Sequence, residues 1–282
     1  MPTGKRQRQR AGLQARQAAA EAHRRRQTRR TRAIAGAFLA LVLIAGLAVI
    51  VNSGNDNSSV EAGSSTTVAP GASSTAATKK PVDLPPVAAG ATVKGDTPCP
   101  STDPAVVVPR TTTFEKPPPL CVNVAKTYTA EMQTTKGLMV ISLDVKGATK
   151  TVNNFVVLAR YHYFDGIAFH RIVPGFVIQG GDPLQTGTGG PGYKFEDELP
   201  KPGQYKIGSL AMANSGPNTN GSQFFIVTGD AGTSLQPNYS LFGQVTQGLE
   251  VVKAIEEVGI PGTQDGRPSE VVTIRSVTIK ET

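Results

Sequence analysis

The sequence predicts a mainly β domain with two helices over its C-terminal half, and three observations support this. From Tyr128 onward, short apolar runs alternate with Gly and Pro, as in antiparallel β proteins. Two segments, 151–161 and 249–258, instead space their apolar residues with the period of a helix. A strand rich in β-branched residues follows at 271–279. Many strands with two helices indicate a β-barrel capped at its ends.

The individual elements follow from local patterns. Residues 128–134 and 138–143 read as two strands joined by a hairpin turn at 135–137. Thr149 or Thr151 could cap the first helix, since their hydroxyls can accept hydrogen bonds from its first turn. The later strands are expected in five apolar runs of the sequence: IAFHRIV, GFVIQG, KIGSLAMAN, QFFIVTG and SLFGQV.

The net charge of +8 belongs to an N-terminal tail. Residues 1–32 carry eleven Lys and Arg against one acid, Glu21, which leaves −2 for the remaining 250 residues. Such asymmetry indicates a membrane or nucleic-acid contact of the tail alone. The nearly neutral folded part is not expected to bind nucleic acid.

A transmembrane helix is predicted at 33–51, where nineteen residues lack any charge or strong polar group. As a helix they would span roughly 30 Å, about the hydrocarbon thickness of a bilayer. A buried core helix is the alternative, but soluble helices rarely lack a polar stripe. The cations before this segment predict a cytoplasmic N-terminus and an exported C-terminal part. A position beside the membrane is sufficient to explain the basic tail, although DNA binding by the tail stays open.

A cleaved signal peptide is the other interpretation of 33–51. The basic region before it is longer than usual, the apolar run is too long, and no A-x-A site follows. The pair Arg29-Arg30 resembles a twin-arginine signal, but an arginine-rich tail contains such pairs by chance. We therefore expect an uncleaved anchor and a single-pass protein of the cell membrane.

Residues 52–124 are predicted to form an extracytoplasmic linker, followed by the folded domain at 125–282. The first part is rich in Ser, Thr, Ala and Gly. It cannot bury enough apolar surface to offset its conformational entropy, so a disordered stalk is expected. Many prolines in the second part favour extended, semi-rigid chain.

Both cysteines, Cys99 and Cys121, lie near the end of this linker. An exported compartment permits a disulfide, and two cysteines allow one pairing. It would close a loop of about 22 residues and stabilise the fold by roughly 3 kcal/mol. A redox pair or a metal site is the alternative, but C-x-x-C spacing and clustered histidines are missing. No set of His, Cys and acids in the sequence has metal-site spacing.

Two long motifs carry a family resemblance: FHRIVPGFVIQGGDP at 169–183 and GSLAMANSGPNTNGSQFFIVTG at 208–229. They resemble the two signature blocks of cyclophilins, and the resemblance extends from about Tyr128 to Ile279. It implies an eight-stranded antiparallel β-barrel, closed and capped by two helices, with a proline-containing peptide held in an outer groove. The implied reaction is cis-trans isomerisation of X–Pro bonds, which needs no cofactor. The uncatalysed rotation about such a bond has a barrier of about 18–20 kcal/mol.

The resemblance also implies roles for individual residues. Arg171 would donate to the prolyl nitrogen, whose lone pair localises as the amide twists. Gln179 would hold the arginine and the substrate carbonyl, whereas His170 would be structural and Asp182 a turn residue. Eight residues are implied to bind substrate. They form the proline pocket, its border and the backbone that pairs with the peptide: Phe176, Val177, Met212, Ala213, Asn214, Phe225, Leu235 and Tyr239.

Three departures from the family pattern bear on function: a methionine, a tryptophan and a histidine of the best-known cyclophilins are replaced here, the methionine by Val177. Ser234 stands where the best-known cyclophilins have tryptophan, in a stretch whose register is uncertain by one position, and Tyr239 stands where they have histidine. The missing tryptophan argues against tight cyclosporin binding, but activity is expected to survive. The G-x-G-x-x-G match at 187–192 is interpreted as a surface loop, because no helix start follows it.

Two functional hypotheses follow. The first is an active isomerase, expected to be a monomer, that assists the folding of exported proteins. The second is a slow or inactive binding module, or holdase, for proline-containing segments. The presence of Arg171 and Gln179 favours the enzyme.

Overall fold

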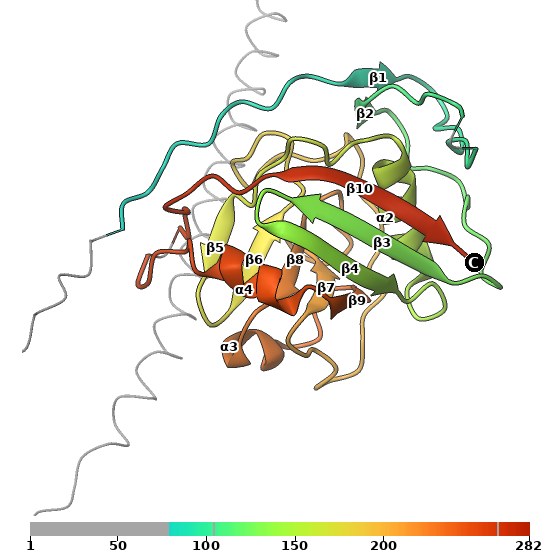
Figure 1. The fold of residues 1–282 in the computed structure, drawn as a ribbon. Helices are drawn as coiled ribbons and strands as arrows, with labels where there is room; N and C mark the ends of the chain where they lie inside the picture. The colour runs from blue at the N-terminus through green and yellow to red at the C-terminus, as the bar shows by residue number, and fades with distance from the viewer. Residues whose placement is uncertain (1–78, 104, 264) are drawn as a thin grey trace, which may run out of the picture. The chain divides into compact units, whose positions relative to one another are not determined.

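A computed structural model describes residues 79–103, 105–263 and 265–282 (Figure 1). The predicted tail at 1–32, the predicted anchor at 33–51 and the first part of the stalk lie outside these residues. Within the described ranges, no helix is long and apolar enough to span a bilayer. The described residues belong to one compact unit.

Eight antiparallel strands form one curled sheet around which the rest of the domain is arranged (Figure 1). Their spatial order is β10, β3, β4, β9, β7, β8, β6, β5. The hairpin predicted near 135 is present as β3 and β4. The bounds are β3 Tyr128–Thr134, β4 Gly137–Leu143, β5 Arg171–Val173, β6 Val177–Gly180, β7 Ser209–Met212, β8 Phe224–Val227, β9 Leu241–Gln247 and β10 Ile274–Glu281.

The sheet is open, so the prediction of a closed barrel is wrong. In the described part, β10 and β5 are its edges. The segment before β5 meets the start of β10 only at the isolated bridge between Ala168 and Thr273 and through three backbone hydrogen bonds between 166–169 and 272–274. The amide of Ile172 in β5 donates to the carbonyl of Gly266 at 2.7 Å. The loop at Gly266 therefore occupies the hydrogen-bonding edge of β5 that a neighbouring strand would need in order to close the barrel.

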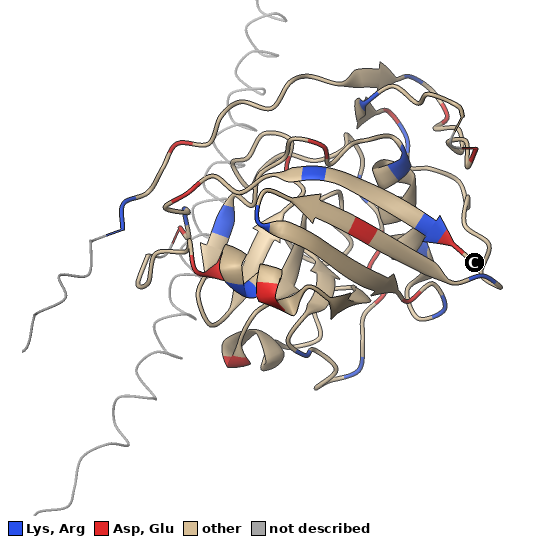
Figure 2. Ribbon diagram, viewed as in Figure 1, with Lys and Arg blue, Asp and Glu red and all other residues tan. Residues whose placement is uncertain are grey.

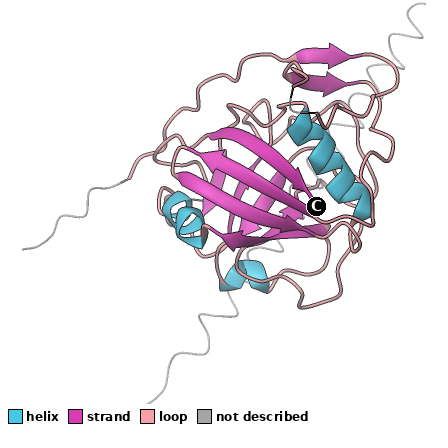
Figure 3. Ribbon diagram, turned by 45° about the vertical axis from the view of Figure 1, so that its right-hand side comes forward, coloured by secondary structure: helices cyan, strands magenta, loops and turns pink. Residues whose placement is uncertain are grey.

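Two helices lie at opposite ends of the curled sheet, as Figure 3 shows. They are α2 (Thr149–Arg160) and α4 (Leu249–Glu256), close to the two predicted helical segments. A third, short helix, α3 (Asp230–Thr233), was not predicted. With four residues it has no amphipathic period that a sequence pattern could reveal.

The start of α2 is capped differently from the prediction. Its N-cap is Ala148 without a side-chain cap, so neither Thr149 nor Thr151 fills that role. The carboxylate of Glu198 instead accepts from the backbone amides of Lys150, at 3.0 Å, and Thr151, at 2.8 Å. A carboxylate distant in sequence thus satisfies first-turn amides and complements the positive end of the helix dipole.

An interior cluster of buried side chains fills the space between the sheet, α2 and α4. Phe155 of α2 is central to it, with ring centroids 5.0 Å from Phe164, 5.8 Å from Phe224 and 5.4 Å from Phe242. The sheet residues in this cluster include Ile141, Ile178, Leu210, Met212, Phe224 and Ile226. Aromatic side chains bury large apolar areas and contribute strongly to the stability of such a core.

The arm, residues 79–124, packs against this domain. It contains the parallel pair β1 (Ala91–Val93) and β2 (Thr111–Phe114). Cys99 and Cys121 form a disulfide, the pairing that the sequence analysis favours. Asn153 of α2 accepts from the amide of Cys121 at 2.7 Å and donates to the carbonyl of Pro119 at 2.8 Å. The second half of the predicted linker therefore has fixed contacts, because its few apolar residues and its backbone find partners on the domain.

Candidate active site

A second apolar cluster lies on the outer face of β6, β7 and β8. Successive residues of a strand point to opposite faces. Phe224 therefore enters the interior cluster, whereas Phe225 lies outside it. We call this the groove cluster; it consists of buried Val177, Tyr205, Ala211, Phe225 and Val227 and half-buried Phe176, Ala213, Leu235, Tyr239 and Leu241.

The groove cluster contains six of the eight residues implied to bind substrate: Phe176, Val177, Ala213, Phe225, Leu235 and Tyr239. Met212 is not among them. Its side chain is 1 % exposed and belongs to the interior cluster, so its assignment to the proline pocket is wrong. Ala211 of the same strand takes the outer position. Strict alternation along the strand sends Leu210 and Met212 inward together.

Tyr239 is fixed at the rim of the groove cluster by two aromatic neighbours. Its ring meets that of Phe225 edge-on, with centroids 5.3 Å apart. The hydroxyl of Tyr205 donates to the Tyr239 carbonyl at 2.7 Å and accepts from its amide at 3.2 Å. Burial raises the pKa of Tyr205 to about 12, which keeps the phenol protonated. Sequence reasoning missed Tyr205, since no local motif marks it.

Arg171 lies at the border of the groove cluster. Its guanidinium carbon is 5.8 Å from the ring centroid of Phe176, within cation–π distance. Burial lowers the pKa of Arg171 from its ordinary value and the Tyr239 phenol opposes this, but guanidinium stays charged near neutral pH. Across the described ranges, the guanidinium makes no hydrogen bond or ion pair. It is thus a half-buried cation with donors available to a ligand.

Gln179 of β6 stands directly opposite Arg171 of β5 in the strand register. The structure shows no hydrogen bond between the two side chains, although the resemblance implies that Gln179 holds the arginine. The Gln179 amide donates to Gln223 Oε1 at 3.0 Å, and Gln223 Nε2 donates to the Gly189 carbonyl at 2.9 Å. Gln223, which sequence reasoning did not single out, therefore links Gln179 to the 187–192 loop.

Backbone groups at 213 and 214 border a neighbouring cavity of about 810 Å³. The amide of Ala213 donates to the Gln223 carbonyl at 2.9 Å, and Asn214 Nδ2 donates to the Asn238 carbonyl at 2.9 Å. In the described residues, the main-chain amide and carbonyl of Asn214 have no backbone partner. They can pair with an extended peptide.

Ser234 contributes no aromatic ring to the groove. It is exposed at the end of α3, and its hydroxyl donates to the carbonyl of Asp230 at 2.9 Å. Leu235, the next residue, joins the groove cluster instead. The rim is therefore formed by Leu235 and Tyr239.

Asp182 and His170 support the loop beside Arg171. The buried Asp182 carboxylate accepts from the backbone amides of Leu184, at 2.8 Å, Thr186, at 3.0 Å, and Gly187, at 2.6 Å. His170 is buried, and both of its ring nitrogens lack a hydrogen-bond partner within the described chain. Burial lowers the pKa of His170, which favours the neutral ring. Asp182 thus shapes a loop, as a turn residue does.

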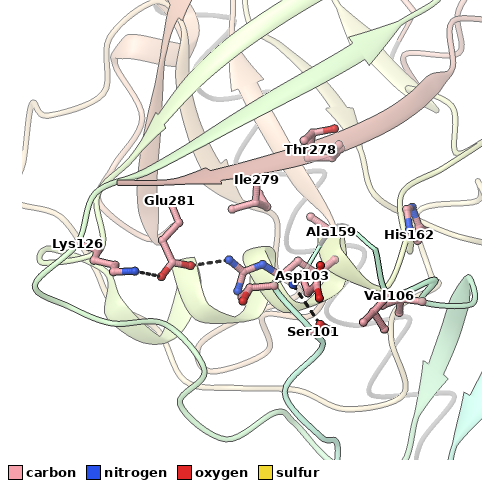
Figure 4. A pocket seen from close by; sticks show the side chains of 13 residues that line it. Ser101, Asp103, Val106, Lys126, Ala159, His162, Thr278, Ile279 and Glu281 are labelled. Atoms are coloured by element: carbon pink, nitrogen blue, oxygen red, sulfur yellow. Dashed lines mark hydrogen bonds and ion pairs between the residues drawn. The ribbon is translucent and has the colours of Figure 1, made fainter.

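Another cavity, of about 520 Å³, lies among α2, β10 and the arm (Figure 4). Glu281 lies there between two cations, 2.8 Å from Lys126 and 2.7 Å from Arg160. None of the residues implied by the resemblance lines it. In the view of Figure 2, Lys and Arg are interspersed with Asp and Glu along the described part of the ribbon.

The curled antiparallel sheet carries an arginine beside an outer apolar cluster, and comparisons with known proteins identify the family of this domain. Residues 129–279 match the model of the family described as cyclophilin type peptidyl-prolyl cis-trans isomerase. The chain is 44 % identical over 171 residues to peptidyl-prolyl cis-trans isomerase A of Mycobacterium tuberculosis, covering 54 % of this chain and 92 % of the relative. It is 42 % identical over 137 residues to a peptidyl-prolyl cis-trans isomerase of Helicobacter pylori, covering 48 % and 83 %.

A solved structure gives the same result. A cyclophilin type peptidyl-prolyl cis-trans isomerase from Cryptosporidium parvum matches with a TM-score of 0.50 and 32 % identity, covering 55 % of this chain and 99 % of that one. The chain belongs to the cyclophilin-type peptidyl-prolyl cis-trans isomerase family. Its activity is cis-trans isomerisation of peptidyl-prolyl bonds.

Proposed function

We propose that this isomerase uses Arg171 as the donor that stabilises the twisted amide, with the groove cluster holding the proline ring. The observation that carries the proposal is the half-buried guanidinium, 5.8 Å from the Phe176 ring and without a protein hydrogen bond in the described residues. A donor that protein groups leave unused can form its hydrogen bond with the substrate.

The chemistry requires only two contributions from the protein. Rotation about an X–Pro bond breaks amide resonance and localises the lone pair on the prolyl nitrogen, against a barrier of about 18–20 kcal/mol. A fixed cationic donor at that nitrogen stabilises the transition state more than the planar ground state. A hundred-thousandfold acceleration corresponds to roughly 7 kcal/mol. Phe176, Phe225 and Leu235 would hold the ring while the preceding residue rotates.

Gln179 and Asn214 would orient the peptide. Both line the cavity beside the groove, and Gln179 also lines the space around Arg171. The Gln179 amide can donate to a substrate carbonyl, and the Asn214 main chain can pair with the extended peptide. The Cryptosporidium parvum protein was also solved in the presence of the dipeptide Ala-Pro, which supports a proline-containing ligand for this fold.

We also propose that the domain acts outside the cell membrane on exported proteins. The apolar segment 33–51 after a basic tail supports an anchor with a cytoplasmic N-terminus. The disulfide between Cys99 and Cys121 supports an oxidising compartment. Digestion of intact cells with an external protease tests this: loss of the domain is expected, and full protection would contradict the orientation.

Substitution of Arg171 tests the donor. With the full chain and a proline-containing tetrapeptide, Arg171→Ala should lower kcat/KM by about 100-fold, because one fixed transition-state donor is worth roughly 3 kcal/mol. Arg275→Ala, which removes an exposed arginine of β10, is the matched control and should leave kcat/KM unchanged. Full activity of Arg171→Ala would show that another group is the donor. A wild-type chain no faster than buffer would favour the holdase.

A further inference from the structure

A cavity of about 760 Å³ beside Arg171 is formed partly by the arm. We call it the arm pocket. From the domain it takes Arg171 and Gln179, and from the arm it takes Asp83, Leu84 and Pro86. The family match begins only at residue 129, so the arm side of this pocket is built from residues outside the matched domain.

Contacts on both sides of Leu84 fix the arm at this position. Before it, the amide of Val82 donates to the carbonyl of Pro268 at 2.9 Å, and the Asp83 carboxylate pairs with Arg267 at 2.6 Å. After it, the carbonyl of Pro85 accepts a hydrogen bond from Gln185. The Leu84 side chain is therefore held at a defined place beside Arg171.

We propose that the arm pocket binds the residues that flank the proline of an extended substrate. This inference rests on the proposed role of Arg171. Continuity of the surface supports it, because Arg171 and Gln179 line the arm pocket and also border the groove. Leu184 and Gly187 line both this pocket and the cavity at Ala213. A peptide with its proline at Arg171 can continue into the arm pocket without leaving the protein surface.

The side chains of the pocket indicate which residue it prefers. Leu184 is 64 % exposed although it belongs to a loop held by Asp182, and half-buried Leu84 and exposed Pro86 also line the pocket. An apolar side chain bound among them would bury surface that both partners otherwise expose to water. We therefore expect a preference for substrates with a large apolar residue near the proline.

The arm itself does not occupy the proline-binding position. None of the described residues of the arm belongs to the groove cluster, although Leu84-Pro85-Pro86 contains X–Pro bonds. The arm thus extends the binding surface and leaves the groove cluster accessible. An arm that blocked substrate would instead contact Phe225 or Leu235.

Peptides of two lengths distinguish these roles in the full chain. The short peptide has four residues with a central Ala-Pro, and two longer peptides add a leucine-containing segment on either the N-terminal or the C-terminal side. Leu84→Ser should lower kcat/KM about three- to ten-fold for one of the longer peptides, through KM, since partial burial of one leucine accounts for a change of this size. The short peptide should react at the wild-type rate.

Two further variants complete the test. Leu184→Ser, on the domain side of the same pocket, should show the same selective loss. Leu199→Ser is the control, because Leu199 is 52 % exposed and lines neither cavity. Unchanged kinetics of both pocket variants on the longer peptides, an equal loss on short and long peptides, or faster turnover of the short peptide by Leu84→Ser would each overturn the proposal. Failure of the proposed donor is a separate result, namely retained short-peptide activity in Arg171→Ala.

Discussion

The interior cluster and the groove cluster are built from neighbouring residues of the same strands, yet they serve different ends. Phe224 and Phe225 are adjacent in β8 and almost equally buried, at 0 % and 5 % exposure. Phe224 is surrounded by the aromatic rings of Phe155, Phe164 and Phe169, whereas Phe225 contacts the partly exposed Tyr239. The two phenylalanines therefore differ in the residues that surround them. Helices α2 and α4 cover the interior face of the sheet, whereas the outer face has a half-buried rim beside Arg171.

Burial alone therefore does not separate a residue of the interior cluster from a residue of the groove cluster. Met212 and Phe225 are both buried apolar residues of the signature blocks. Only the face of the sheet that each side chain takes assigns Met212 to the interior cluster and Phe225 to the groove cluster. Substitutions on the two faces should therefore separate stability from activity.

The largest effect is expected from Phe224→Ala, in the interior cluster. Removing a ring that packs against three others leaves a cavity, which costs about 3–5 kcal/mol of the free energy of unfolding. Urea unfolding followed by far-UV circular dichroism measures this loss. A loss below about 1 kcal/mol would break the distinction between the two clusters.

A smaller effect on a different quantity is expected from Phe225→Ala. Loss of the ring from the groove should lower kcat/KM about 10- to 100-fold, mainly through KM, because ring contacts of this kind are worth roughly 1.4–3 kcal/mol. Met212→Ala is the matched control: it should lose about 2–5 kcal/mol of unfolding free energy and keep the wild-type KM below its unfolding temperature. If Met212→Ala raises KM as Phe225→Ala does, the separation of the two faces fails.

The smallest effect concerns His170, a buried ring at the border of the site. Burial lowers its pKa below the value of about 6.5 expected for the unfolded chain. The unfolded state then binds more protons, so stability rises with pH and is lost as pH falls below about 6.5. Between pH 7.5 and 5.5, we expect the urea midpoint of wild type to fall and that of His170→Gln to fall less. Equal slopes in wild type and His170→Gln would contradict the prediction.

Much of the fold followed from local pattern. The hairpin of β3 and β4, helices α2 and α4 and the C-terminal strand lie within a few residues of their predicted positions, because their periodic apolar spacing is continuous. The short α3, the cap that Glu198 provides for α2 and the open edge at β5 were missed. Each depends on contacts between segments far apart in the chain, which leave no local signal.

The candidate site divides in the same way. The two motifs of the sequence identified Arg171, Gln179 and most of the groove cluster, and they led to the family. They did not reveal Tyr205 or the link from Gln179 to Gln223. These roles arise from hydrogen bonds across 34 and 44 residues of sequence.

Local sequence pattern specifies the residue types and their order: alternating apolar strands, a cation within a signature block, and two cysteines in the arm. Tertiary structure alone decided that Met212 points inward, that Arg171 is left without a protein partner in the described residues, and that residues 83–86 form one side of a pocket beside it. The alternation of side chains along a strand depends only on neighbouring residues. Which face of the sheet becomes covered depends instead on the segments, distant in sequence, that pack against it.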